Sequence, residues 1–108
     1  MYTVIYELYR AEGWTREQFV EYWLHTHRPI AMTMPNLRGY KICPVTDSGE
    51  VLGDEVDGFV MLVFDSEDDF NTTHESPEFA ATAADARKFT RHFARYAVDV
   101  HDVIPAGV

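Results

Sequence analysis

The strongest constraint on the fold of this chain comes from two predicted strands that are apolar on both faces. Residues 3–10 are rich in Tyr, Val, Ile and Leu, and residues 56–64 place Val, Leu and Phe on one side and Phe, Met and Val on the other. Aromatic and β-branched residues favour strands, and a strand that is apolar on both faces is expected where both faces of its sheet are covered. Both segments are therefore predicted to be central strands of one sheet.

The order of the other elements predicts the rest of the architecture. A capping box at Thr15 and Gln18 starts a helix, which should end or kink near His27 because Pro29 disfavours helical geometry in the residue before it. The order β-α-β-β-α-β is that of the ferredoxin-like fold, an α+β class with a four-stranded antiparallel sheet and two helices on one face, here as one domain over residues 1–108. The remaining predicted elements are a strand at 38–45, an exposed connection at 46–55, a short helical turn at 67–73, a helix from Ser76-Pro77 to 91, and a strand at 94–103.

The second face of that sheet has no cover within the chain. Leaving it in water would expose an apolar patch well above the few hundred Å² that soluble monomers usually show. A second copy packed sheet against sheet would cover it. We therefore expect a homodimer in which the two sheets form a dimeric α/β barrel.

Composition narrows the classes of partner. A net charge of -9 with Lys and Arg numbering 9 argues against nucleic acid or an anionic membrane surface. No apolar run approaches the ~18 residues that a membrane span needs. The single Cys43 cannot form an intrachain disulfide, and the first residues lack the pattern of a secretory signal. A cytoplasmic protein with no membrane partner is expected.

His27 is the most informative candidate for chemistry. It falls on the apolar stripe of the first helix with Phe19, Trp23 and Leu24, at the spacing that faces a core. A histidine in that row is either a packed core residue or a proton-transfer group that lines a pocket. Imidazole titrates near neutral pH, so it can take a proton from a carbon next to a carbonyl and return it. The residues alone leave both interpretations open.

Tyr40 on the second strand is the predicted partner of His27. A phenol hydroxyl can donate to a carbonyl oxygen as negative charge develops there, although a tyrosine at such a position is, on its own, more often a half-buried strand aromatic. Trp23, Tyr6 and Tyr9 would offer flat apolar walls for a ring or an acyl chain. The hypothesis is an apolar substrate pocket between the first helix and the sheet, with His27 as base and Tyr40 as donor.

The sequence contains no recognisable metal or cofactor motif. His25 and His27 are two positions apart on a helix, so they do not share a face. No glycine-rich phosphate loop, dinucleotide-binding fingerprint or nucleophile elbow is present, so we assign no metal and no cofactor. The acids predicted to form a solvated loop face are Asp47, Glu50, Asp54, Glu55 and Asp57.

Several short motifs, in order along nearly the whole chain, resemble the EthD family of dimeric α/β barrels. They are Gly-Trp-Thr-x-x-x-Phe from residue 13, Tyr-Trp-x-x-x-His-x-Pro from residue 22, Leu-Arg-Gly-Tyr from residue 37, Phe-Asp-Ser from residue 64 and Ser-Pro-Glu from residue 76. The family that this chain resembles looks mixed in function. It includes a lactone methylisomerase, decarboxylases or dehydratases of aromatic polyketides, and a protein that accompanies ether-degrading oxidation. The resemblance thus implies fold and pocket more firmly than reaction.

In the methylisomerase branch a helix histidine and a strand tyrosine look like the catalytic pair, and these carry over to His27 and Tyr40. That branch also uses a cysteine from a later element, whereas this chain has none after Cys43. Cys43 is predicted to point to the opposite sheet face from Tyr40, because the two are three positions apart on one strand.

Three functions follow from these interpretations. The leading one is a small cofactor-independent enzyme that isomerises, decarboxylates or dehydrates a hydrophobic cyclic or aromatic molecule, in catabolism or polyketide metabolism. The second is an oxidoreductase of the monooxygenase-like barrels. The third is a non-catalytic accessory binding protein of an oxidative degradation system.

Overall fold

The computed structural model describes residues 1–107 and contains one four-stranded sheet. Its strands are β1 (Tyr2–Arg10), β2 (Gly39–Pro44), β3 (Gly58–Phe64) and β4 (Thr90–Val98). They lie in the order β2-β3-β1-β4, and each neighbouring pair is antiparallel. The first and third strands are central, as their two apolar faces predict. Residue 108, the last position of the predicted domain, lies outside the described residues.

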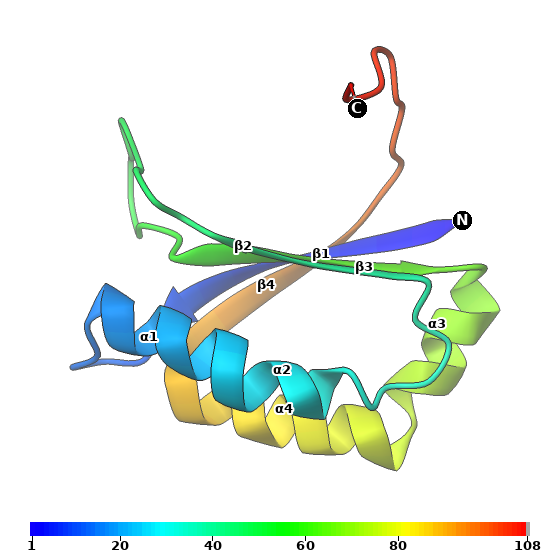
Figure 1. Ribbon diagram of the computed structural model, residues 1–108, viewed down its shortest axis with the longest axis horizontal. Helices are drawn as coiled ribbons and strands as arrows, with labels where there is room; N and C mark the ends of the chain where they lie inside the picture. Colours follow the sequence, from blue (N-terminus) through cyan, green and yellow to red (C-terminus); the bar gives the residue numbers. More distant parts are fainter. Residues whose placement is uncertain (108) are drawn as a thin grey trace.

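The helices lie on one side of the sheet, as Figure 1 shows. Two helical segments cover it side by side. The first is made of α1 (Arg16–Tyr22), η1 (Trp23–His27) and α2 (Arg28–Ala31), and the second is α4 (Pro77–Phe89). The short helix α3 (Glu67–His74) sits between β3 and α4. This confirms the predicted α+β, ferredoxin-like class.

The first helix begins as predicted and continues further than predicted. Thr15 accepts a hydrogen bond from the backbone N–H of Gln18, whose side chain accepts in turn from the backbone N–H of Thr15. The expected end or kink near His27 is a widened π-helical turn, after which the helix continues to Ala31. Because Pro29 has no N–H and its ring would press on an earlier carbonyl in a regular α-helix, a widened turn just before it accommodates the ring.

The predicted boundary between the second helix and the last strand was wrong. Helix α4 ends at Phe89 and β4 begins directly at Thr90, four residues before the predicted start. The register aligns Thr3 with Val98, so β1 has no residues left to pair with positions 100–103. Residues 100–103, the predicted end of the last strand, therefore have no partner on β1.

The core on the helix side consists of two aromatic-rich clusters. One gathers around Val4, Leu62 and Phe64, and the other around Phe19, Trp23, Leu8 and Phe89. Side chains of β1 and β3 alternate between this core and the opposite face, as the sequence pattern predicts.

Trp23 reaches the sheet only because β3 has a glycine beneath it. A Cβ built on Gly58 would lie 2.3 Å from the Trp23 ring. The Trp23 side chain is fully buried there. Glycine at this position is thus a packing requirement of the fold.

Asp57 is not part of a solvated loop face, contrary to expectation. It is 1% exposed, and its carboxylate accepts from the backbone N–H of Arg10 at 2.9 Å and from the Arg10 guanidinium at 2.7 Å. A buried carboxylate needs such partners to offset its lost hydration. Arg10, on the neighbouring central strand β1, supplies both, one from its backbone and one from its charged side chain.

The other face of the sheet carries apolar side chains that no helix covers. Met61 pairs with Ile5 across the central strands, and Ile5 pairs with Tyr96, which is 54% exposed. The β2–β3 connection and the C-terminal segment after β4 extend on this same side, away from the helices (Figure 1). Both carry exposed apolar residues, among them Leu52 and Ile104.

Candidate active site

His27 lies at the centre of a buried hydrogen-bonded chain. Its Nδ1 is 2.7 Å from Oδ2 of Asp85 on helix α4, and the Tyr22 hydroxyl donates to Oδ1 of the same carboxylate at 2.7 Å. The side chains of His27 and Asp85 are 8% and 6% exposed. A carboxylate only accepts, so Nδ1 of His27 carries the proton in the neutral ring, and Nε2 is left with its lone pair.

Burial and Asp85 shift the pKa of His27 in opposite directions. Burial lowers the pKa of the imidazole below its usual 6.5, while the hydrogen bond and charge of Asp85 raise it; burial is the larger effect. The ring is therefore neutral at neutral pH, which is the form that accepts a proton. Burial, aided by Asp85, raises the pKa of Tyr22 to about 12, so this hydroxyl stays protonated and continues to donate.

The local backbone brings His27 to this position. The π-helical turn Trp23–His27 closes with the N–H of Arg28 bonding to the carbonyl of Trp23. Both Trp23 and His27 are buried within it, and the His27 ring lies 4.8 Å from the ring of Phe89 between centroids. Such turns are frequent at functional sites.

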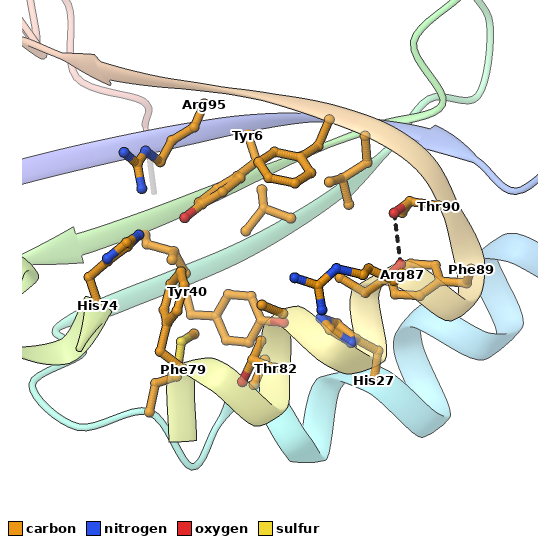
Figure 2. Close-up of a pocket in the computed structure, with 18 residues that line it drawn as sticks. Tyr6, His27, Tyr40, His74, Phe79, Thr82, Arg87, Phe89, Thr90 and Arg95 are labelled. Atoms are coloured by element: carbon orange, nitrogen blue, oxygen red, sulfur yellow. Dashed lines mark hydrogen bonds between the residues drawn. The ribbon is translucent and has the colours of Figure 1, made fainter. Parts of the chain in front are cut away.

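The His27 ring faces a cavity of about 170 Å³ between the helices and the sheet. Aliphatic and aromatic side chains from all four strands and from α2 and α4 form most of its wall. Figure 2 shows His27 at one end and the polar tips of Tyr6 and Arg95 toward the other. The apolar lining residues include Leu8, Ala31, Met34, Val60, Leu62 and Phe79.

Tyr40 and Tyr6, two of the predicted pocket residues, line this cavity with His27. Burial raises the pKa of Tyr40 to about 12, against a smaller opposite effect of the Arg28 charge. Its hydroxyl is therefore a proton-bearing donor at neutral pH. Figure 2 shows that hydroxyl pointing toward the end of the cavity where His27 lies.

Tyr9 and Trp23, the other two predicted wall residues, lie elsewhere. The Tyr9 ring stacks with His92, 4.1 Å away between centroids, and pairs across the sheet on the face opposite the helices. Trp23 is enclosed between Phe19, Phe89 and Gly58 and has no exposed surface. Neither side chain reaches the cavity, because Tyr9 has the wrong strand parity and the Trp23 ring fills the space above Gly58.

Sequence reasoning missed Asp85 and Tyr22. Asp85 lies on α4, 58 positions from His27, so no local pattern joins the two. One signal was available, since Asp85 falls on the helix face of Thr82 and Phe89 at i-3 and i+4. A lone carboxylate on an apolar helix face is expected to have a buried partner.

A metal is not favoured by the arrangement of these groups. Among residues 1–107, no three His, Cys, Asp or Glu side chains are grouped closely enough to hold one. Over the same described part of the chain, no helix is long and apolar enough to cross a bilayer.

Comparison with known proteins identifies the family. The model of the EthD domain matches residues 11–92, which is most of the chain, so this protein belongs to the EthD family. Among curated proteins none matches its sequence.

Solved structures share the fold at low sequence identity. An EthD family protein from Bacillus halodurans is 20% identical with a TM-score of 0.75, covering 94% of this chain and 100% of its own. A protein from Thermobifida fusca, described as dimeric and ferredoxin-like, is 19% identical with a TM-score of 0.68 over 92% and 90% of the two chains. A mutant form of SnoaB from Streptomyces nogalater, a cofactor-independent oxygenase, is 13% identical with a TM-score of 0.68 over 97% of each chain. At these identities the likenesses show the fold alone, which is ferredoxin-like.

Proposed function

We propose that this protein is a cofactor-independent enzyme that performs acid–base chemistry on a hydrophobic cyclic or aromatic small molecule. The observation that carries the proposal is the buried His27–Asp85 contact of 2.7 Å beside an apolar cavity. Asp85 holds Nδ1–H, so Nε2 is the nitrogen offered to a bound molecule. A core histidine with only a structural role needs neither a free nitrogen nor a cavity.

The reaction begins with removal of a proton from a carbon next to a carbonyl. Nε2 of His27 takes the proton, and the electron pair of the broken C–H bond moves to the carbonyl oxygen as an enolate forms. The Tyr40 hydroxyl donates a hydrogen bond to that oxygen. The carboxylate of Asp85 stabilises the imidazolium until the proton is returned.

The fate of the enolate decides the overall reaction. Return of the proton at a different carbon gives isomerisation. Loss of a hydroxyl group from the adjacent carbon gives dehydration, because His27 protonates the departing hydroxyl and it leaves as water. Decarboxylation of a β-keto acid would start from its carboxyl proton, which Nε2 of His27 takes as carbon dioxide leaves and its electron pair forms the enolate. The Tyr40 hydroxyl donates to the enolate oxygen, and His27 returns the proton to carbon.

A second candidate function is cofactor-independent oxygenation, supported by the fold likeness to SnoaB. Deprotonation of a hydroxylated aromatic by His27 would give an electron-rich anion that reduces dioxygen directly. The first step is again proton transfer to Nε2 of His27, here from a hydroxyl and not from carbon, and the two functions differ in whether oxygen is consumed. The third possibility, binding without catalysis, leaves His27 without a chemical role.

We further propose that the active unit is a homodimer joined through the uncovered sheet face. The supporting observations are the apolar side chains of that face, exposed as far as 54% at Tyr96, and the exposed Leu52 and Ile104 on the two segments that extend on the same side (Figure 1). The structurally similar protein from Thermobifida fusca is described as dimeric.

The function is tested by proton exchange. The protein is incubated in D₂O with cyclic ketones, lactones and hydroxylated aromatics, and deuterium incorporation at carbon is followed by NMR. His27→Gln is expected to lower the exchange rate by about 10²–10⁴-fold, and Tyr40→Phe by a similar factor. His25→Gln, two positions away and exposed, is the matched control and leaves the rate unchanged.

Oxygen consumption in the same samples separates the two reactions. Consumption that depends on His27 favours oxygenation, whereas exchange without consumption favours isomerase or lyase chemistry. Ligand binding with no exchange, unaltered in His27→Gln, would leave only the binding function and overturn the proposal.

A further inference from the structure

The cavity differs in charge from the rest of the molecule. The chain has 18 Asp and Glu and a net charge of -9, yet none of the 18 residues that line the cavity is acidic. Two arginines, Arg87 and Arg95, and a second histidine, His74, do line it. An apolar cavity with cationic groups and no lining carboxylate favours a negatively charged ligand.

Three polar side chains meet at the end of the cavity away from His27. The Arg95 guanidinium lies 5.3 Å from the Phe70 ring centroid, and the His74 ring lies 5.6 Å from the same centroid. Tyr6 pairs with Arg95 across the sheet, so both point to the helix side. Figure 2 shows the Tyr6 hydroxyl, the Arg95 guanidinium and His74 on this side, and we call it the anion end.

The Tyr6 hydroxyl at the anion end has an unused hydrogen bond. Its oxygen is buried and has no partner with good hydrogen-bond geometry within residues 1–107. Burial raises the pKa of Tyr6, and the Arg95 guanidinium, close enough for a weak hydrogen bond and a charge interaction, opposes that rise. Buried polar groups are nearly always paired, so an unpaired hydroxyl in a cavity wall indicates a place for a ligand atom. A protonated phenol there would donate to an anion.

Arg95 also lacks a counterion. Arg95 is an exposed residue of the edge strand β4. Among the described residues it makes no salt bridge, like Arg28 and Arg87, whereas Arg10, Arg16, Arg38 and Arg91 each contact a carboxylate. The aromatic ring of Phe70 holds its guanidinium by a cation–π contact, which leaves the N–H donors free. A guanidinium with free donors matches the two oxygens of a carboxylate.

We propose that the ligand of this cavity is a cyclic or aromatic carboxylate whose anionic group binds Arg95 and the Tyr6 hydroxyl at the anion end. Its ring then lies against the apolar wall, and its far side faces Nε2 of His27 and the Tyr40 hydroxyl. The assignment of that far side as the reacting part depends on the proposed function; the binding of the anion does not.

The test compares two probes of the same shape and different charge. 2-Naphthoate carries a carboxylate at neutral pH, and 2-naphthamide replaces it with a neutral amide on the same ring system. Affinity for each is measured by calorimetry or NMR titration of the full chain. We expect 2-naphthoate to bind at least tenfold more tightly, as for a hydrogen bond made to a charged group.

Variants locate the anion within the cavity. Arg95→Gln is expected to remove most of the preference for 2-naphthoate, and Tyr6→Phe to weaken 2-naphthoate binding several-fold with no loss of thermal stability. Arg38→Gln removes one positive charge from an exposed pair with Asp65 and should leave the preference unchanged. Retention of the melting temperature shows that each variant is folded.

Each other outcome contradicts the assignment. Equal affinity for the two probes, or binding of neither at millimolar concentration, would overturn it. A preference that survives Arg95→Gln but is lost in Arg87→Gln would move the anion to the opposite end. Both probes are scored by binding and not by proton exchange, so a failure of the catalytic proposal leaves this result intact.

Discussion

The two faces of the sheet carry similar apolar residues, but only one of them is covered by helices. On the helix side, apolar strand residues are covered by the chain itself, and the cover encloses a cavity. On the opposite side, Ile5, Met61 and Tyr96 have the same apolar character and no helix above them (Figure 1). The first side is complete in one chain, whereas the second is completed, in our proposal, by another copy.

Two histidine–aspartate pairs make the same contrast on a smaller scale. His27 and Asp85 meet at 2.7 Å with side chains 8% and 6% exposed, beneath the helices. His101 and Asp99 meet at 3.1 Å with side chains 77% and 90% exposed, on the segment after β4. Exposed pairs contribute little because water screens them, whereas a buried pair fixes the tautomer and orientation of its ring. Burial rather than residue type makes the first pair a candidate site.

The largest expected effect is a loss of activity when the buried pair, but not the exposed pair, is altered. Asp85→Asn removes the acceptor that holds Nδ1–H of His27, and the ring can then turn or change tautomer. We expect proton exchange on a reactive substrate to fall by about 10²–10⁴-fold. Asp99→Asn makes the same change in the exposed pair and should have no effect. Equal activity of both variants would show that the buried pair has no catalytic role.

The next effect concerns the uncovered face. Met61→Lys places a charge in the middle of that face and is expected to raise the dimer dissociation constant by at least 100-fold, since an unpaired buried charge costs several kcal/mol. Met32→Lys makes the same substitution at a residue that is 63% exposed in the segment after α2. Sedimentation velocity should show monomers for Met61→Lys and dimers for Met32→Lys. A wild-type chain that sediments as a folded monomer would remove the proposed dimer.

A smaller effect tests the packing that supports His27. Gly58→Ala would push a methyl group to within 2.3 Å of the Trp23 ring, so the turn that carries His27 has to shift. We expect the free energy of unfolding to fall by about 1–3 kcal/mol in urea melts. At Gly107 an added Cβ meets nothing within 4 Å, and Gly107→Ala should match the wild type. A wild-type melt for Gly58→Ala would mean that the Trp23 contact is easily rearranged.

The smallest effect is the pH dependence of stability. Since the pKa of His27 is lower in the folded chain than its usual 6.5, the unfolded chain takes up a proton first as the pH falls. Stability from neutral His27 is therefore complete above about pH 6.5 and is lost below it. Wild type should lose more stability than His27→Gln between pH 7 and 5. A parallel loss in the two proteins would mean that burial does not disfavour the charged ring.

Sequence patterns predicted most of the fold because its signals are local. The capping box at Thr15, the central position of β1 and β3, and the opposite parity of Cys43 and Tyr40 all follow from spacing within one element. The start of β4 was missed because the register with β1, a long-range feature, decides it.

The site was predictable only in part for the same reason. His27 stands out because a titratable group interrupts an apolar stripe, but its partner Asp85 comes from a helix 58 positions away. Asp57 was assigned to the surface because it follows an acidic loop, yet it is buried because Arg10 on another strand donates hydrogen bonds to its carboxylate. Spacing within one element does not reveal pairings between distant elements.

The most direct test of the central claim is the tautomer and pKa of His27, measured by ¹H–¹⁵N NMR of the imidazole over a pH titration. The account predicts a neutral ring with the proton on Nδ1, a free Nε2 and a pKa below 6.5. A proton on Nε2, or a pKa at or above 6.5, would contradict the assignment of His27 as the base.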